Sequence, residues 1–313
     1  MELRQLEYIV TIADEQSIAK AAQKLFITQS ALNQQLLKLE RELGVPLFNR
    51  IKEGLVPTHA GEVYLDAARK MLLMKAETYR YIQDIADMKK GEISIAYTPE
   101  QGSLMFSHIY PIFHKMYPDI TFRIVEARVK QAEQLLSAGK VNIALTSYAS
   151  GGKKPQFDYT DIGAELLVFG VPKSDPLSKL AGEQSYIRFP KIDIHLLQDK
   201  PLIMLTKDTR FRNMLDSLFS EAGFKPRILF ESINTNTVFN MVKSQVAPAF
   251  FPQSYVDPKA PVSYFSVGEE LRWMRSIIIR RGSYISKAEK DFIELARDYV
   301  QSLPGGSKYD PES

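Results

Sequence analysis

A chain of 313 residues with 45% hydrophobic and 25% charged residues has the composition of an ordinary globular protein and the length of about two domains. It contains no cysteine, which excludes disulfides, thiolate nucleophiles, zinc fingers and iron–sulfur clusters. The 40 basic and 37 acidic residues leave a net charge of +3, so bulk charge does not indicate a nonspecific nucleic-acid binder. Without a secretory signal or an apolar run of membrane-spanning length, we expect a cytoplasmic protein that does not contact a membrane.

Apolar residues recur at helical spacing in three successive segments near the amino terminus. The three sets are Leu6, Ile9, Val10 and Ala13, then Ile18, Ala21, Ala22 and Leu25, then Leu32, Leu36, Leu39 and Leu43. Ser17 and Thr28 are candidate N-caps, and Gly44 is a candidate helix terminator. Two short helices with two or three residues between them indicate a helix-turn-helix.

The outer face of the third predicted helix is polar and rich in short amides, which suit DNA reading because Asn and Gln pair with adenine in the major groove. The alternative is a three-helix bundle whose polar face meets only water. A strand–glycine–strand pattern at 46–57 predicts a wing that brings basic side chains to the phosphate backbone. The candidate DNA-binding residues are Thr28, Gln29, Ser30, Asn33, Gln34, Lys38, Arg50 and Lys52.

Residues 1–61 resemble the winged helix-turn-helix of LysR-type transcriptional regulators. The motifs that carry the resemblance are Leu3-Arg4-Gln5-Leu6, Ala21-Ala22-x-x-Leu25, Thr28-Gln29-Ser30-Ala31-Leu32, Leu39-Glu40-x-Glu42-Leu43-Gly44, Leu47-Phe48-x-Arg50 and Thr58-x-Ala60-Gly61. The resemblance implies that Gln29, Ser30, Asn33 and Gln34 face the bases and that Arg50 holds a phosphate. Asn33-Gln34 stands where the family commonly has Ser-Arg, which predicts the family fold with a different operator sequence.

A long helix is predicted from Thr58 to about Met88, since no Gly or Pro follows Gly61. Its approximate heptad seam consists of Leu65, Ala68, Leu72, Tyr79, Ile82 and Ala86, interrupted by Lys75. The alternative is a long helix packed on its own chain. We favour a partner helix from a second copy, and in the resembled family this segment is the dimerising linker helix.

A strand–helix alternation begins after Lys89-Lys90-Gly91 and then recurs, which predicts two similar α/β lobes. The predicted strands are 93–97, 121–125, 141–145, 201–205, 227–230 and 247–251, and the predicted helices are 104–117, 130–138, 210–221, 234–243 and about 286–302. Crossings between the lobes are expected near 166–171 and 263–279, and the last helix returns to the first lobe.

The fold class we predict is therefore α+β multidomain. It comprises a winged helix-turn-helix at 1–58, a dimerising linker helix at 59–90, an effector-binding domain at 91–303 and a flexible tail at 304–313. Lobe I of the effector-binding domain spans about 91–165 plus 268–303, and lobe II spans about 166–267. The two-lobed part resembles the effector domain of the same family, which is similar to periplasmic solute-binding proteins. Where that family often has Gly-x-Gly, this chain has Gln245-Val246-Ala247, so we expect a differently shaped rim in lobe II.

Ligands of open α/β sheets bind at the carboxyl ends of the strands, near helix amino termini. This rule selects Thr98, Glu100, Gln101, Ser103, Arg128, Thr146 and Ser147 in lobe I, and Thr206, Arg210 and Asn234 in lobe II. Arg128 or Arg210 would pair with an anionic effector. Glu100 leaves a cationic or zwitterionic effector open, and the alternative for each Arg is a surface salt bridge. The sequence Gly151-Gly152-Lys153-Lys154 is interpreted as a solvated loop.

No metal-ligand spacing, phosphate-binding loop or dinucleotide fingerprint is present, so we expect no metal, no cofactor and no enzymatic activity. The predicted function is sequence-specific regulation of transcription with a small-molecule effector between the lobes. The expected partners are double-stranded promoter DNA, the effector, further copies of the chain and, as a further candidate, RNA polymerase; the resemblance implies a dimer that assembles to a tetramer. The alternatives are a cytoplasmic solute-sensing module that has lost DNA binding, and an unrecognised enzyme in the α/β part.

Overall fold

The computed structural model describes residues 2–52, 54–86, 90–99, 101–148, 152–182, 189–207, 209–267 and 271–303, without the side chains of Gln101 and Arg210. The chain divides after Met88 into two compact units, which are described separately. The tail predicted at 304–313 lies outside the described residues. No helix in the described ranges combines the length and hydropathy needed to cross a bilayer.

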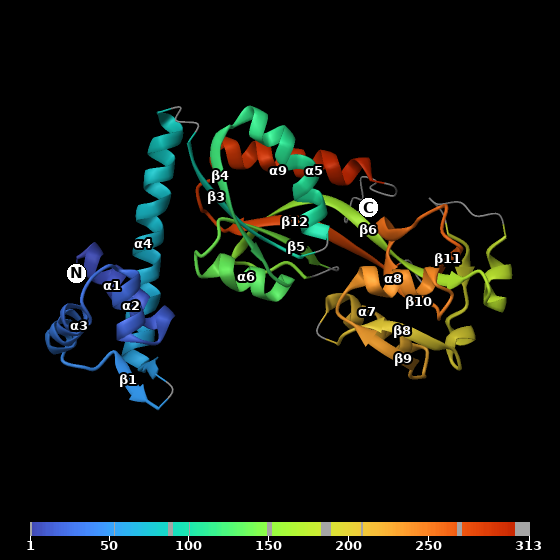
Figure 1. The fold of residues 1–313 in the computed structure, drawn as a ribbon, viewed down its shortest axis with the longest axis horizontal. Coiled ribbons are helices and arrows are strands. Elements are labelled where there is room, and N and C mark those ends of the chain that lie inside the picture. The colour runs from blue at the N-terminus through green and yellow to red at the C-terminus, as the bar shows by residue number, and fades with distance from the viewer. Residues whose placement is uncertain are drawn as a thin grey trace. The chain divides into compact units, whose positions relative to one another are not determined.

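The first unit is a three-helix bundle followed by a β-hairpin and a long helix (Figure 1). Its elements are α1 (Leu3–Glu15), α2 (Ile18–Lys24), α3 (Gln29–Leu43), β1 (Phe48–Ile51), β2 (Gly54–Pro57) and α4 (His59–Ile85). The predicted caps are confirmed, because the Ser17 and Thr28 side chains accept backbone N–H groups of α2 and α3, and Gly44 ends α3 in the left-handed conformation.

One hydrophobic cluster joins all the helices of this unit. Leu6 and Ile9 of α1, Leu32 and Leu36 of α3 and Leu65 of α4 are all nearly inaccessible to solvent. The predicted helical faces of α1 and α3 are therefore the buried faces, except at Leu43, which is 42% exposed at the end of α3. Burial of an aliphatic side chain of this size is worth about 1.5–3 kcal/mol.

The predicted heptad seam of α4 is wrong over its first half. Leu65 and Ala68 are buried in the cluster of their own chain, and Leu72 packs against it. This face of α4 contacts α1, to which Lys75 and Arg69 add ion pairs with Glu7 and Asp14 at 3.1 and 2.9 Å. Lys75 interrupts the seam because it pairs with α1 of the same chain.

The second half of the predicted seam is exposed at Tyr79 and Ile82, and Ile82 also belongs to a second face of α4 that is exposed and apolar. Val63, Met71, Met74, Ile82 and Ile85 keep 44–68% of their accessible surface. Val63, Met74 and Ile85 recur every eleven residues, which is close to three helical turns, so the set forms one stripe along the helix axis. We call these five residues the α4 stripe.

The second unit consists of two α/β lobes that share one strand. The lobe I elements are β3 (Lys90–Tyr97), α5 (Gln101–Met116), β4 (Asp119–Glu126), α6 (Val129–Ser137), β5 (Ile143–Tyr148), β12 (Arg272–Arg280) and α9 (Lys287–Ser302). The lobe II elements are η1 (Pro176–Ala181), β7 (Lys191–Ile192), η2 (Ile194–Leu197), β8 (Pro201–Leu205), α7 (Arg210–Glu221), β9 (Arg227–Ser232), α8 (Thr235–Lys243), β10 (Ala249–Pro252), η3 (Gln253–Tyr255) and β11 (Val262–Val267). The shared strand is β6 (Phe157–Pro172).

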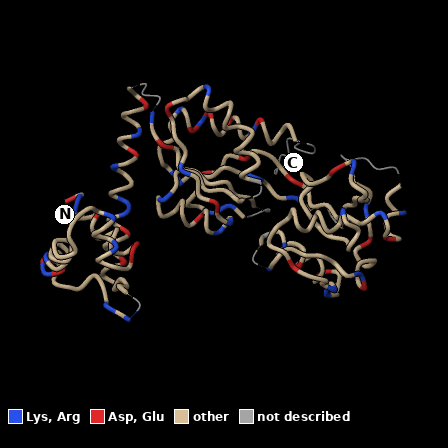
Figure 2. The backbone as a smooth tube through the Cα atoms, viewed as in Figure 1, with Lys and Arg blue, Asp and Glu red and all other residues tan. Residues whose placement is uncertain are grey.

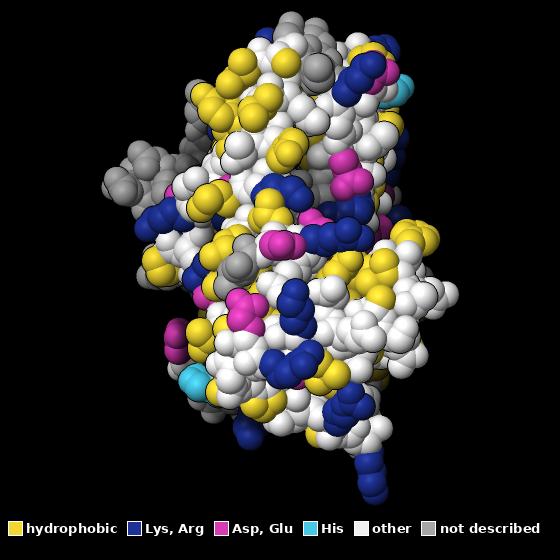
Figure 3. Space-filling model, turned by 90° about the vertical axis from the view of Figure 1, so that its left-hand side faces the viewer, with side chains coloured by type: hydrophobic (Ala, Val, Ile, Leu, Met, Phe, Trp, Pro, Cys, Tyr) yellow, Lys and Arg dark blue, Asp and Glu magenta, His cyan; other side chains and the backbone are white. Residues whose placement is uncertain are grey.

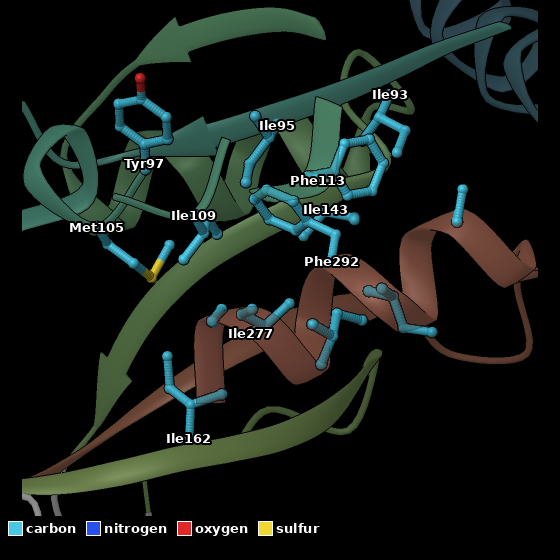
Figure 4. Packing of buried hydrophobic residues seen from close by; sticks show 14 of the residues in the cluster. Ile93, Ile95, Tyr97, Met105, Ile109, Phe113, Ile143, Ile162, Ile277 and Phe292 are labelled. Atoms are coloured by element: carbon cyan, nitrogen blue, oxygen red, sulfur yellow. The ribbon is translucent and has the colours of Figure 1, made fainter. Parts of the chain in front are cut away.

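The lobe I sheet has the order β4-β3-β5-β12-β6, with β3, β4 and β5 parallel. Helices α5 and α9 cover one face, where Phe113 and Phe292 meet Ile95, Ile143 and Ile277 (Figure 4). Helix α6 covers the other face. The return of the last helix to lobe I is therefore confirmed.

The lobe II sheet has the order β7-β11-β6-β10-β8-β9, covered by α8 on one face and by α7, η1 and η2 on the other. The crossing predicted near 166–171 falls in the second half of β6, which pairs with β12 up to Leu166 and with β10 from Leu167 onward. The second predicted crossing comprises two strands, since β11 belongs to lobe II and β12 to lobe I.

Gln245 occupies the first of the positions that are often Gly in the resembled family, and its φ of 62° is left-handed. Its side chain accepts a hydrogen bond from the backbone N–H of Ser174 and donates one to the carbonyl of Pro261, at 2.9 and 2.8 Å. These bonds join the loop after β6 to the start of β11. A glycine could adopt the same backbone more easily but could not make these bonds.

Candidate DNA-binding surface and effector site

The amino-terminal turn of α3 is polar and exposed. Thr28 caps the helix by accepting the Ala31 N–H at 3.2 Å, and its hydroxyl lies 3.2 Å from that of Ser30. Gln29, Gln34 and Lys38 are exposed on the same helix, as the helical pattern predicts. Thr28 therefore has a structural role in positioning this turn, besides any contact with DNA.

The hairpin formed by β1 and β2 is the predicted wing, and it carries Arg50 and Lys52, both exposed. Glu40 of α3 accepts the backbone N–H of Leu47 at 2.7 Å, which holds the start of the wing against α3. At the other end, the N–H of Leu55 donates to the Gln16 carbonyl, and a Cβ on Gly54 would lie 2.6 Å from that oxygen. Glycine at 54 therefore allows the wing to lie against the end of α1.

Asn33 and Arg50 are brought together by the tertiary structure. The Arg50 guanidinium Nη2 donates to Asn33 Oδ1 across 3.3 Å. Asn33 is half-buried, whereas Arg50 is exposed. The candidate base-reading residue and the candidate phosphate-binding residue are thus in direct contact, which residue spacing did not reveal.

Among the described residues, Lys and Arg are interspersed with other side chains and do not form one continuous basic patch (Figure 2). Figure 2 shows Lys and Arg in the β1–β2 hairpin and along the helices of the first unit, interspersed with acidic residues. The face drawn in Figure 3 carries basic, acidic and hydrophobic side chains intermixed with other residues. Contacts with DNA would therefore depend on individual side chains rather than on net charge.

In lobe I, the predicted effector residues gather at the carboxyl ends of neighbouring strands. β3 pairs with β5 at Ala96 and Ala144, so Thr98 and Thr146 follow at the same level of the sheet. Ser103 is half-buried in the first turn of α5, and Arg128 is exposed at the position that caps α6. Glu100 and the Gln101 side chain lie outside the described residues.

In lobe II, the backbone N–H of Thr206 donates to the Ser232 carbonyl at 3.1 Å, which brings the ends of β8 and β9 together. Asn234 follows β9 and caps α8, because its Oδ1 accepts the Thr237 N–H at 2.9 Å. The side chain of Arg210, at the start of α7, lies outside the described residues.

Two lobe I carboxylates near these strand ends are neutralised by consecutive lysines. Lys154 donates to the buried Glu133 of α6 at 2.5 Å, and Thr146 lies 3.4 Å from the same carboxylate. Lys153 donates to Asp161 at 3.1 Å and lies over the rings of Tyr148 and Tyr159. A hydrogen bond with the Tyr148 hydroxyl raises the pKa of Lys153.

Lys153 and Lys154 lie in a loop and keep 49% and 43% of their side-chain surface exposed, as interpreted, but both also form ion pairs, and Gly151 lies outside the described residues. Their partners Asp161 and Glu133 lie on β6 and α6, and no local signal in the sequence connects them.

Ser147, another predicted effector residue, is half-buried on β5 opposite Arg275 of β12.

A buried ion pair lies where β6 passes from lobe I to lobe II, and sequence reasoning missed it. Arg275 of β12 donates through Nε to Glu165 of β6 at 2.8 Å, and its Nη2 contacts the other carboxylate oxygen. Glu165 also accepts the Ser254 N–H of η3 in lobe II at 3.2 Å. The side chains of Glu165 and Arg275 are 3% and 13% exposed. This carboxylate therefore connects elements of both lobes.

Comparison with known families agrees with this division of the chain. The family model described as a LysR substrate binding domain matches residues 86–301. The model described as a bacterial regulatory helix-turn-helix protein of the lysR family matches residues 3–62. The chain belongs to the LysR family. It is a LysR-type DNA-binding transcriptional regulator with an effector-binding domain, and proteins of this family bind promoter DNA and effector ligands and form oligomers.

Relatives match this LysR-type regulator over most of its length. The uncharacterized HTH-type transcriptional regulator YcgK of Bacillus subtilis is 26% identical over 96% of this chain and 95% of its own. The regulator AlsR of the same organism is 28% identical over 81% of each chain.

Solved structures show the same fold. A full-length OxyR variant from Pseudomonas aeruginosa is 23% identical, with a TM-score of 0.70 over 98% of this chain and 100% of that one. Full-length CbnR complexed with its target DNA is also 23% identical, with a TM-score of 0.58 over 95% of this chain and 99% of that one.

Proposed function

We propose that this regulator reads its operator with the amino-terminal half of α3 and holds the DNA backbone with its wing. The residues assigned to the bases are Gln29, Ser30, Asn33 and Gln34, and those assigned to phosphates are Thr28, Lys38, Arg50 and Lys52. The observation that carries this proposal is the hydrogen bond between Arg50 and Asn33, since it gives the wing and α3 a common orientation. Phosphate contacts position a protein on DNA, whereas contacts with base edges read the sequence.

We propose further that the binding unit is a homodimer formed through the α4 stripe. A helix that exposes a continuous apolar stripe over its whole length is stabilised when a partner covers that stripe. Dimers bind duplicated half-sites about one helical turn of DNA apart, or multiples of it. Assembly of dimers to a tetramer and contact with RNA polymerase are extensions of this proposal. Because the protein acts on promoter DNA, we expect it in the cytoplasm.

The effector is proposed to bind between the lobes, at the strand ends that carry Thr98, Ser103, Arg128, Ser147 and Thr206. Arg128 is the exposed cation of this set, at the amino terminus of α6. An anion there would gain a charge-assisted hydrogen bond and the favourable end of the helix dipole. Thr146 and Asn234 have a smaller part in this proposal, since Thr146 lies against Glu133 and Asn234 caps α8. A ligand that binds one arrangement of the lobes better than another would shift the population of that arrangement.

A footprint on the DNA immediately upstream of its own gene, at a stated salt concentration, tests the proposal. We expect protection of a dyad that spans two or more helical turns. Carboxylate metabolites added to the same assay should change the protected boundaries, and the change should be absent for Arg128→Ala. Lack of protection on this DNA, together with lack of enrichment of any duplex from a random pool, would leave the solute-sensing alternative in its place. Protection that responds equally to ligands in Arg128→Ala would remove Arg128 from the effector site.

A further inference from the structure

Phe26 is the most exposed of the large hydrophobic side chains described in this protein. The residue retains 94% of its accessible surface, compared with 68% for Met74 and Ile85 on the α4 stripe. It lies in the turn between α2 and α3. A single exposed apolar residue is common on protein surfaces, but an aromatic side chain with almost no contact to its own chain is not explained by folding.

The backbone of Phe26 is also unfavourable for an aromatic residue. Its φ of 55° is left-handed, a conformation that Gly and Asn adopt at lower cost. The turn holds this conformation through backbone bonds, since the N–H groups of Phe26 and Ile27 donate to Gln23 and Ala22. Neighbouring Leu25 and Ile27 pack on the core of the unit. The fold therefore requires the turn, but it does not require a phenylalanine side chain in it.

The other described non-glycine residues with positive φ have structural roles. Gln16 ends α1, and its carbonyl accepts the Leu55 N–H of the wing. Gln245 makes the side-chain hydrogen bonds with Ser174 and Pro261 described above. Phe26 has the same backbone cost with its side chain directed into solvent.

The position of Phe26 points to DNA. It lies two residues before Thr28, the cap of α3, and the exposed Gln29 and Ser30 follow directly. We infer that Phe26 is an apolar DNA contact, packing on the nonpolar part of a nucleotide at the edge of the groove that α3 enters. Two groups offer this chemistry there, the C5-methyl group of a thymine and the carbon face of a deoxyribose. The inference rests on the proposed use of α3 as the reading helix and extends the DNA-binding surface beyond it.

The test uses three variants of the full-length protein and a duplex that the wild-type protein enriches from a random-sequence pool. Phe26→Asn keeps a residue suited to the left-handed turn, Phe26→Ala removes the ring alone, and Leu43→Ala changes an exposed apolar residue at the far end of α3. We expect Phe26→Asn and Phe26→Ala to weaken binding about tenfold, a loss of about 1.4 kcal/mol. We expect Phe26→Asn to raise the melting temperature, because Asn relieves the backbone cost. Leu43→Ala should leave the affinity unchanged.

A higher melting temperature with weaker DNA binding in Phe26→Asn would indicate a DNA contact. A structural role for the ring would instead lower both the melting temperature and the affinity. Replacing each thymine of the duplex by uracil then distinguishes the two nucleotide groups. If one replacement weakens the wild-type protein but not Phe26→Ala, the contact is the thymine methyl group; if none does, it is the sugar. Unchanged affinity of both Phe26 variants on an enriched duplex would overturn this inference and leave the proposed function intact. Failure to enrich any duplex would overturn both. Loss of dimer formation in Phe26→Asn would assign the side chain to a second copy instead and overturn the inference.

Discussion

At the scale of single residues, the contact between Arg50 and Asn33 changes how the DNA-binding surface is expected to respond to mutation. A free base-reading amide and a free phosphate-binding guanidinium would act independently. In this chain Asn33 Oδ1 accepts a hydrogen bond from Arg50 before any DNA is present. Each side chain therefore orients the other, and their contributions to binding are coupled.

A double-mutant cycle on an enriched duplex tests this coupling. Asn33→Ala should lose about 1–3 kcal/mol of discrimination at one base pair, and Arg50→Ala should weaken binding to all sequences and reduce the salt slope by about 1. Because the two side chains contact each other, the double variant should lose at least about 0.5 kcal/mol less than the sum of the single losses. Lys52→Ala paired with Asn33→Ala is the control, and its losses should add. Additive losses for Asn33 and Arg50 would show that the contact has no effect on binding.

Helix caps were predicted correctly at this scale, whereas the predicted ligand contacts stay predictions. Ser17, Thr28 and Gly44 act within one turn of their own helix, so the local sequence is sufficient to assign them. Asn234 was predicted at the effector site, and it caps α8. An Asn after a strand and before a helix fits both roles, and only the position of its Oδ1 separates them.

At the scale of elements, α4 shows that a periodic pattern can predict a helix correctly and still assign the wrong face to the partner helix. The helix was predicted almost to its ends, but the seam that begins at Leu65 and Ala68 packs on α1 of the same chain. The exposed α4 stripe shares only Ile82 with the predicted seam. Periodicity reports that a helix has an apolar side, and it cannot report which neighbour covers that side.

Substitutions on two faces of α4 test the assigned interface. Met74→Glu places a charge on the α4 stripe at a side chain that is 68% exposed, so the monomer should keep its stability while the dimer dissociates. Ala76→Glu places the same charge on the opposite, exposed face and should leave the dimer intact. Sedimentation velocity of the full-length protein measures both. A stable Met74→Glu dimer would assign the stripe a different partner.

At the scale of the whole effector-binding domain, the lobes share the continuous strand β6, and a buried ion pair lies where this strand passes from one lobe to the other. β6 leaves the lobe I sheet at Leu166 and enters the lobe II sheet at Leu167. Glu165, next to this point, accepts hydrogen bonds from Arg275 on the lobe I side and from Ser254 on the lobe II side. Movement of one lobe relative to the other would bend the chain at this carboxylate.

Removal of one partner of this buried ion pair should lower the free energy of unfolding far more than removal of one partner of a surface ion pair. Arg275→Ala removes the guanidinium from the buried Glu165 carboxylate, which should lower the free energy of unfolding by about 3–5 kcal/mol. Arg281→Ala, at the exposed pair with Asp158 just after the same strand, should lower it by less than about 1 kcal/mol. Denaturant unfolding of the full-length protein measures both values. Equal losses would show that Glu165 is neutralised by other groups.

The sequence by itself determined the order and type of most elements, the helix caps and the wing. These features depend on residues close together in the chain, where capping, periodicity and turn chemistry act. The motifs of the first 61 residues also indicated the family, which both family models confirm.

Only the tertiary structure decided which faces and which charges meet. Arg275 and Glu165 are 110 positions apart, and Lys153 and Lys154 bind carboxylates on β6 and α6. The order of strands in the two sheets and the face of α4 that packs on α1 were likewise decided only by the tertiary structure. The physical reason is that burial and ion pairing depend on distance in space, which the chain sets only when it folds back on itself.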